Sequence, residues 1–454
     1  MRDLLRETAD LAADFLESLP ERPVFPRVTV DELRARLGGP LPEEPRNPRE
    51  VVAELAAAGA GGAVAIPSGR YFGFVIGGAL PASLAADWLT SAWDQNAGLY
   101  VGGPAASVVE EVAGAWLAEL LRLPAHASVA FVTGTQMAHV TVLAAARHHV
   151  LAAHGWDVES DGLRGAPPIR VVAGAKRHVT VNRALRLLGL GTGSIVEVPA
   201  DDQGRMRPDV LRDALRAGGP TIVCAQAGEV NTGAFDPLGE IADAAVEAGA
   251  WLHVDGAFGL WAAASPKLAH LVAGAERADS WAVDGHKWLN VPYDSGIAFC
   301  ARPEVHRAAI SATAEYLVRA EAGGPRDQVD WTPEFSRRAR GFTVYAAIRS
   351  LGRQGIADLI DRCYDHARRF AEELAALPGA AILNEVVLNQ VLLRCETDER
   401  TAEVLRAVQE SGEAWMSGTT WQGRAAIRIS VSNWSTTDDD VDRTVATFAR
   451  AAAS

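Results

Sequence analysis

Short apolar runs alternate with stretches of helical periodicity through the middle of the chain. Apolar residues recur at helical spacing over 107–122 and 136–153. Brief apolar runs bounded by glycine or polar residues separate such stretches, and we expect each of them to form a strand: 129–133, 169–174, 195–199, 221–226, 251–256, 280–284 and 296–301. Seven such runs, with helices between several of them, predict an α/β domain built on a mostly parallel sheet.

The first 60 residues have a different pattern, of helices interrupted by prolines. Apolar residues recur at helical spacing over 4–15, a short helix begins near Asp31, and the glycine- and proline-rich stretch 38–48 predicts a linker. The apolar face of so short a segment cannot form a core of its own. It should therefore pack on the rest of the chain or on a second subunit.

The region beyond residue 340 returns to helix and strand. A long helix over 342–353 and 355–377 precedes two strands, 386–395 and 425–432, with a helix between them. This pattern indicates a smaller α/β domain. We therefore expect three parts, which are an N-terminal helical segment used for dimerisation, a large domain and a small C-terminal domain: 1–75, 76–342 and 343–454.

Composition excludes several classes of protein. The net charge of −14 argues against a nucleic-acid binder, which needs a basic surface. Cys224, Cys300, Cys363 and Cys395 lie far apart and form no CxxC pair, so they predict neither a metal site nor a disulfide framework. Acidic residues interrupt the apolar stretch at the N-terminus, and no run of about 20 apolar residues occurs elsewhere. We expect a soluble cytoplasmic protein that binds neither nucleic acid nor membrane.

The stretch 283–290, Val-Asp-Gly-His-Lys-Trp-Leu-Asn, carries a lysine directly after an apolar run. A lysine is seldom buried without a partner, because a desolvated ammonium is costly. In isolation Lys287 is more simply explained as a surface residue at the end of a strand. The alternative is an amine that is desolvated so that it can attack a carbonyl group.

A carboxylate, Asp255, lies in a similar position near the end of the run 251–256. Asp255 has apolar and aromatic neighbours along the chain on both sides, where a carboxylate needs a cationic partner. It could simply cap the following turn. A pyridinium nitrogen is the other candidate partner, because an acid of this kind accompanies the lysine of enzymes that use pyridoxal 5′-phosphate (PLP). Together with Lys287 on the next strand, it favours a PLP enzyme.

The stretch 132–137 joins a predicted strand to a predicted helix through Gly134. Backbone N–H groups at the start of a helix form a cradle for phosphate. The glycine-rich run 189–193 lacks the spacing of a dinucleotide fingerprint and precedes a strand, so we reject that interpretation.

Together these stretches resemble the group II PLP-dependent amino-acid decarboxylases, which include the aromatic-L-amino-acid, histidine and glutamate decarboxylases. The resemblance covers nearly the whole chain, and the HVDGA and GHKW boxes are its most specific parts. The motifs that carry it are 71–74, 132–138, 177–184, 231–237, 253–257, 285–288 and 331–338. It implies the PLP fold-type I architecture, a homodimer, and decarboxylation of an L-amino acid, aromatic or bulky and apolar, to the amine and CO₂.

The resemblance also implies individual roles. Lys287 would carry PLP as a Schiff base, with His286 near the phosphate, while Asp255 would pair with the ring nitrogen and keep it protonated. Ala257 and His178 would pack on the two faces of the ring. The remaining implied site residues are phosphate donors (Thr135 and Gln136), a loop beside the cofactor (Asn231, Thr232 and Asp236) and the lining of the substrate pocket (Tyr71, Phe72 and Phe74). For the last three, an apolar strand packed in the core is an equally simple interpretation.

One departure from the family concerns the proton donor. The animal aromatic decarboxylases carry a tyrosine on a mobile loop, three residues before a tryptophan, and the matching stretch 321–331 has Gln328 at that position. A glutamine cannot act as a general acid near neutral pH. His178 or a water molecule would then deliver the proton, or the product would differ from the amine. Three alternatives therefore stay open: decarboxylation with oxidative deamination to an aldehyde, transamination, and PLP binding without turnover.

Overall fold

The computed structural model describes residues 1–312 and 324–453, which form two compact units. The larger unit contains Ala79–Arg368 and Asn384–Val391, and the smaller contains Met1–Gly78, Arg369–Leu383 and Leu392–Ser454. The N-terminal segment and most of the C-terminal region thus belong to one unit. The three-part division at residues 75 and 342 stays a prediction.

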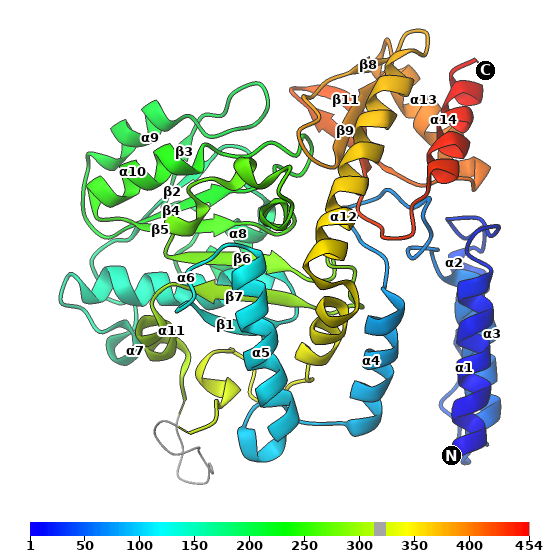
Figure 1. Cartoon of the computed structure of the whole chain (residues 1–454), viewed down its shortest axis with the longest axis horizontal. Helices are drawn as coiled ribbons and strands as arrows, with labels where there is room; N and C mark the ends of the chain where they lie inside the picture. Colours follow the sequence, from blue (N-terminus) through cyan, green and yellow to red (C-terminus); the bar gives the residue numbers. More distant parts are fainter. Residues whose placement is uncertain (313–323, 454) are drawn as a thin grey trace. The chain divides into compact units, whose positions relative to one another are not determined.

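A seven-stranded mixed sheet forms the centre of the larger unit (Figure 1). Its strands are β1 (Ser128–Val132), β2 (Arg170–Gly174), β3 (Ile195–Val198), β4 (Thr221–Gln226), β5 (Trp251–Asp255), β6 (Ser280–Asp284) and β7 (Gly296–Cys300). Their order is β1-β7-β6-β5-β4-β2-β3, with β7 antiparallel to both neighbours and the other pairs parallel. All seven predicted strands and the mostly parallel sheet are confirmed.

Helices cover this sheet because its strands are apolar on both faces. Every residue of β1, β4, β5, β6 and β7 is buried. On α6 (Thr135–Ala152), Ala138 and Val142 pack against Ala130, Ala282 and Ala298 of three adjacent strands. The other helices of this unit are α4 (Pro81–Trp93), α5 (Pro104–Leu120), α7 (Val158–Asp161), α8 (Val179–Leu187), α9 (Pro208–Leu215), α10 (Leu238–Ala248) and α11 (Pro303–Ile310). The helix α4 was not predicted from the sequence.

The direction of the strands brings distant parts of the chain together. Because β1 and β6 are both antiparallel to β7, they run in the same direction as β2, β3, β4 and β5. The carboxyl ends of six strands therefore lie along one edge of the sheet, which is where α/β proteins bind their ligands. The predicted lysine, the predicted carboxylate and the Gly134 turn all follow strands that end there.

The smaller unit is built on a four-stranded sheet of order β10-β11-β9-β8. Its strands are β8 (Ala381–Ile382), β9 (Gln390–Arg394), β10 (Ser417–Trp421) and β11 (Arg424–Ser430). The helices α13 (Asp398–Ser411) and α14 (Asp438–Ala453) belong to the same unit, as do the N-terminal helices described below. The two predicted strands are confirmed as β9 and β11, although β9 begins later than expected. The strands β8 and β10 were not predicted from the sequence, because β8 has two residues and β10 carries polar residues at most positions. The long helix α12 (Gly341–Ala375) is confirmed, and Gly352 interrupts it with a φ of 62°.

The N-terminal helices are α1 (Arg2–Glu17), α2 (Val30–Leu37) and α3 (Pro48–Gly62). None of the residues of α1 and α2 is buried, and Ala58 is the one buried residue of α3. Large apolar side chains on α1 and α3 are exposed, among them Leu5 (58%) and Leu55 (61%). No helix in the described part of the chain is both long and apolar enough to cross a membrane.

Candidate active site

Lys287 follows the carboxyl end of β6 and forms an ion pair there. Its Nζ lies 2.9 Å from Oδ2 of Asp284, the last residue of the strand. The chain contains only three lysines. Lys267 is an exposed residue paired with Asp365, whereas Lys176 lines a small cavity described below. Lys287 is the lysine whose partner, Asp284, also contacts the turn after β1.

Asp284 connects this lysine to the turn after β1, and the sequence analysis missed it. Its Oδ1 accepts a hydrogen bond from the backbone N–H of Thr135 (2.6 Å) and lies 3.5 Å from Nε2 of His286. Burial alone would raise the pKa of Asp284, but Lys287, His286 and the bond from Thr135 outweigh it and lower this pKa. The signal available in the sequence was a second aspartate at the end of an apolar run, three residues before the lysine.

The turn between β1 and α6 leaves one polar atom without a partner. The hydroxyl of Thr135, at the first position of α6, is buried and has no hydrogen-bond partner in the described structure. Gly296 of β7 allows the turn to approach closely, because a Cβ there would lie 2.3 Å from the Cα of Gly134. Gln136 donates from its side-chain amide to the carbonyl oxygen of Thr180 (3.3 Å). The backbone N–H of Thr135 is thus engaged by Asp284, and its hydroxyl is available to an anion.

Asp255 is buried at the end of β5. Its Oδ1 accepts from the backbone N–H of Ala257 (3.2 Å), and its Oδ2 lies 3.4 Å from Nε2 of His139 on α6. Burial alone would raise the pKa of Asp255, but the neighbouring His139, His178 and Lys287 outweigh it and hold this pKa below its ordinary value. Asp255 is therefore a carboxylate at neutral pH, as a partner for a protonated ring nitrogen must be.

His178 and His286 are both fixed by local contacts. His178 is the N-cap of α8, where its Nδ1 lies 2.8 Å from the Thr180 hydroxyl and its backbone N–H donates to the side chain of Gln226 (3.2 Å). The ring of His286 stacks on Tyr293 at 4.3 Å, and burial lowers its pKa. The backbone N–H of Ser295 donates to Nδ1 of His286 (3.3 Å).

The loop after β4 is held by buried carboxylates. Glu229 accepts from the side-chain amide of Asn231 (2.9 Å) and the backbone N–H of Thr232 (2.8 Å). Asp236 accepts from the backbone N–H groups of Met206 and Gln226, both at 2.7 Å, and burial raises its pKa to about 7. These bonds give Asp236 a structural role in shaping the loop.

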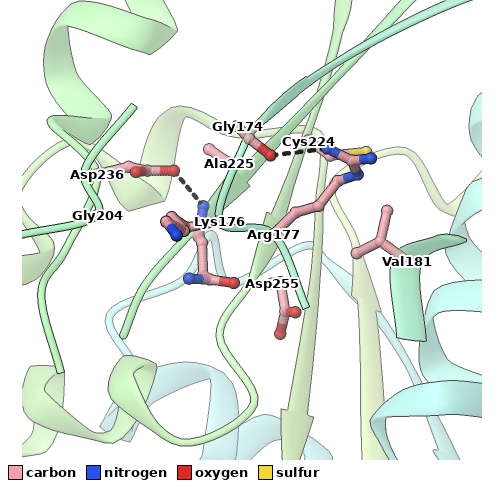
Figure 2. Close-up of a pocket in the computed structure, with 10 residues that line it drawn as sticks. Gly174, Lys176, Arg177, Val181, Gly204, Cys224, Ala225, Asp236 and Asp255 are labelled. Carbon is pink, nitrogen blue, oxygen red and sulfur yellow. Dashed lines mark hydrogen bonds between the residues drawn. The ribbon is translucent and has the colours of Figure 1, made fainter. Parts of the chain in front are cut away.

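A cavity of about 10 Å³ lies beside Asp255 (Figure 2). Arg177, which donates to the carbonyl oxygen of Gly174 (3.0 Å), and Asp236 border it from other elements. This volume is about what one water molecule needs. The cavity accordingly places room for an ordered water next to the site carboxylate, but it is too small for a substrate.

Tyr71, Phe72 and Phe74 belong to the smaller unit and do not form a strand. Tyr71 stacks on Trp415 at 5.3 Å, and Phe74 lies 5.4 Å from the same ring. Phe72 is buried against Phe370, which agrees with the alternative interpretation of a core residue. Phe74 is 56% exposed and has a φ of 57°. A left-handed aromatic residue is uncommon, and such strain is concentrated at functional sites.

Gln328 lies in a short 3₁₀ helix, Gln328–Asp330, and is only 1% exposed. Both polar atoms of its side-chain amide are buried and make no hydrogen bond within the described residues. Residues 313–323, which precede it in the sequence and include the start of the matched stretch 321–331, lie outside those residues. The correspondence of Gln328 with the tyrosine of the animal enzymes stays a prediction.

The donor set fits PLP on chemical grounds. It combines an amine (Lys287), a buried carboxylate (Asp255), a half-buried histidine (His178) and a buried hydroxyl with no partner among the described residues (Thr135). The amine can bond to the carbonyl carbon of PLP, and the carboxylate can pair with its pyridinium nitrogen. The histidine can pack on the aromatic ring, and the hydroxyl can donate to the phosphate. Among the described residues, no group of three or more His, Cys, Asp or Glu side chains could hold a metal ion.

Comparison with known proteins supports the same class. The family model described as the pyridoxal-dependent decarboxylase conserved domain matches residues 42–396. The aromatic-L-amino-acid decarboxylase of Bacillus atrophaeus is 28% identical, over 97% of this chain and 93% of its own. The L-2,4-diaminobutyrate decarboxylase of Rhizobium meliloti is 31% identical, over 80% of this chain and 74% of its own. The 4-hydroxyphenylacetaldehyde synthase of Rhodiola rosea is 28% identical, over 75% of this chain and 72% of its own.

A crystal structure of Oryza sativa TDC with PLP and tryptamine has the same fold. It matches with a TM-score of 0.93 and 25% identity, over all of this chain and 97% of the other. The fold and the site define a fold-type I PLP enzyme. The chain belongs to the pyridoxal-dependent decarboxylase family. The predicted cofactor and the predicted activity, PLP-dependent decarboxylation of an amino acid, are confirmed at the level of the family.

Proposed function

We propose that this enzyme decarboxylates an aromatic L-amino acid and releases the amine. The observation that carries the proposal is the arrangement at the carboxyl edge of the sheet, where Lys287 is paired with Asp284 and Asp255 is a buried carboxylate. Bound PLP supplies the electron sink for the pair left on Cα when CO₂ departs. The chain's own residues must therefore hold the cofactor, orient the substrate and handle the protons.

Each of these tasks has a proposed residue. Lys287 binds the cofactor covalently, and Asp284 holds its amine in place and ties it to the start of α6. Asp255 keeps a proton on the ring nitrogen, while the Thr135 hydroxyl donates to the phosphate. His178 and Ala257 pack on opposite ring faces. We further propose that Gln136, Asn231 and His286 complete the cofactor site.

The choice of an aromatic substrate rests on the aromatic residues of the smaller unit. The exposed ring of Phe74 and the Tyr71–Trp415 stack offer aromatic faces, and aromatic pairs gain about 0.5–1.5 kcal/mol beyond the burial of their area. We propose that Tyr71 and Phe74 contact the substrate, and that Phe72 supports them from the core. The relative from Bacillus atrophaeus, an aromatic-L-amino-acid decarboxylase, favours the same class.

The absence of a loop tyrosine favours an aldehyde as a second product. The sequence 321–331 has no tyrosine, and one relative is an aldehyde synthase. Incubation of purified PLP-loaded enzyme with single L-amino acids, with products identified by mass spectrometry, tests both outcomes. Tryptamine, tyramine or phenethylamine with CO₂ would support the proposal. Turnover of diaminobutyrate or glutamate alone would reject the aromatic substrate, and a keto acid without CO₂ would indicate transamination.

We also propose that the enzyme is a cytoplasmic homodimer. The apolar residues Leu5, Leu11, Val51 and Leu55 of α1 and α3 are exposed by 40–61% in the single chain, and a second copy would cover such a face. None of the four cysteines forms a disulfide in the described structure, where all four are buried. Thiols that form no disulfide suit a reducing compartment.

A further inference from the structure

Two buried histidines form a second layer behind Asp255. His139 of α6 points its Nε2 at the carboxylate, and its Nδ1 lies 2.9 Å from Nε2 of His253 on β5. The Nδ1 of His253 lies 3.0 Å from the Ser280 hydroxyl, which also accepts from the indole N–H of Trp251 (2.9 Å). We call His139, His253, Ser280 and Trp251 the buried histidine chain.

This chain lies entirely inside the larger unit. His139, His253 and Ser280 are 0% exposed, and Trp251 is 1% exposed. Burial, followed by the neighbouring His139, lowers the pKa of His253 to about 3, so this ring is neutral under physiological conditions. A neutral imidazole has one nitrogen that donates and one that accepts, and its partners decide which is which.

The proton positions follow from Trp251, at the end of the buried histidine chain that lies away from Asp255. The indole nitrogen of Trp251 can only donate, so the Ser280 oxygen accepts there. If the hydroxyl proton of Ser280 points to Nδ1 of His253, the remaining proton of that ring is on Nε2. It then donates to Nδ1 of His139, whose own proton must be on Nε2.

The reverse direction of these hydrogen bonds is unfavourable at the carboxylate of Asp255. If His253 donated to Ser280, its Nε2 would accept from Nδ1 of His139. With one ring proton, on Nδ1, His139 would then turn the lone pair of its Nε2 toward Oδ2 of Asp255, which lies 3.4 Å away. Adding a second proton to His139 would remove that repulsion, but it would bury a further charge, which costs desolvation free energy.

We propose that the buried histidine chain runs in one direction and presents the Nε2–H of His139 to Asp255. His139 and His253 are thus positioning residues for the carboxylate that pairs with the cofactor, an assignment that rests on the proposed function. The 3.4 Å separation exceeds the usual 2.7–3.2 Å of an N–H···O bond, and Nε2 of His139 makes no hydrogen bond in the described structure. We expect the separation to shorten when the cofactor is bound.

Neutron diffraction from a deuterium-exchanged crystal of the PLP-loaded enzyme tests the direction itself. We expect deuterium on Nε2, and none on Nδ1, of both His139 and His253, with the Ser280 hydroxyl pointing to His253. Deuterium on Nδ1 of His139, alone or together with Nε2, would overturn the proposal. This measurement needs no variant, so it does not depend on how well a substituted core folds.

Cofactor titration of variants tests the consequence. We expect His139→Leu to bind PLP about tenfold more weakly, because a hydrogen bond to a charged group is lost. His139→Gln, whose terminal N–H occupies a similar position, should recover most of the affinity. His306→Leu is the matched control, since His306 is also 0% exposed and bonded to a serine, Ser128, but has no contact with Asp255 in the described structure.

The positioning role of His139 and the proposed function are contradicted by different outcomes. Wild-type affinity in His139→Leu would refute the positioning role while leaving the enzyme's function intact. An equal loss in His306→Leu would show that core damage, not the contact with Asp255, is responsible. A wild-type protein that binds no PLP would instead reject the proposed function.

Discussion

Lys287 and Asp284 form an ion pair at the end of β6, with Nζ and Oδ2 2.9 Å apart. Asp284 is almost fully buried, whereas the lysine side chain keeps 20% of its surface exposed. The ammonium group of Lys287 is therefore held by Asp284, while the side chain stays accessible to a reactant. Because the same carboxylate accepts from the N–H of Thr135, the pair also fixes the lysine relative to the start of α6.

We predict that purified PLP-loaded protein has a visible absorption band and that Lys287→Ala abolishes it together with activity. Without this amine the cofactor has no covalent anchor at the site. Lys267→Ala, which alters an exposed lysine, should keep the band. Borohydride reduction and peptide mapping give a second measurement, since only three lysines compete. Label on Lys176 or Lys267 in place of Lys287 would contradict the assignment.

We predict that Asp255→Asn retains part of its cofactor but loses about 10²–10³-fold in kcat, the usual loss when one electrostatic group of a site is removed. The amide cannot hold a proton on the ring nitrogen. Asp279→Asn is the control, because Asp279 is half-buried just before the opposite end of β6 and binds Arg302. Turnover near that of the wild type in Asp255→Asn would remove Asp255 from its proposed role.

Acid should destabilise the fold through its buried histidines. Burial lowers the pKa of His306 to about 3, whereas the unfolded chain takes up this proton near pH 6.5. The folded pKa is the lower one, so the contribution of His306 to stability is fully present above about pH 6.5 and is lost as the pH falls toward 3. Between pH 7 and pH 5 this loss amounts to about 2 kcal/mol.

The matched variant is His306→Gln, which cannot titrate. Its urea midpoint, followed by tryptophan fluorescence, should depend less on pH between 7 and 5 than that of the wild type. His270→Gln, at an exposed histidine, should leave the wild-type dependence unchanged. Parallel curves for His306→Gln and the wild type would show that His306 does not contribute to acid unfolding.

The sequence predicted the sheet well because its strands are apolar on both faces and bounded by glycine or polar residues. Polar strands gave no such signal, which is why β10, SGTTW, was missed. Lys287 and Asp255 were found because each is a charged residue at the end of an apolar run. His139 and His253 could not be paired from sequence alone, since their contact depends on how α6 packs across β5.

The proposed dimer is tested with the double variant Leu5→Glu, Leu55→Glu. Both residues are exposed in the single chain, so the substitutions cost little in the monomer but bury charge in an interface. We expect light scattering to show a monomer with reduced cofactor content. Val246→Glu, at a residue of α10 that is 68% exposed, is the control and should remain dimeric. A double variant that stays dimeric would place the interface elsewhere.

The last prediction concerns the proton that replaces CO₂. The stretch 321–331 offers no tyrosine, and Gln328 is buried in its 3₁₀ helix. A glutamine is no general acid, so protonation of the substrate carbon depends on His178, Lys287 or water and should be slow. Slow protonation leaves time for reaction with oxygen or for protonation at the wrong carbon. We therefore expect mainly amine, accompanied by measurable aldehyde in air or by gradual inactivation through abortive transamination.

Product ratios measured with and without oxygen decide this point, because oxygen is needed for the oxidative route alone. Removing oxygen should abolish the aldehyde and leave the amine. Gln328→Tyr is a demanding variant, since a tyrosine is larger than the buried glutamine and overpacking costs about 1–3 kcal/mol. If it folds and the phenol reaches the site, the proportion of amine should rise, whereas Gln328→Leu, which fills the same space without a proton to give, should not raise it. Clean, stoichiometric amine from the wild type in air would show that another group protonates the carbon efficiently, and His178→Asn would then be expected to slow amine formation.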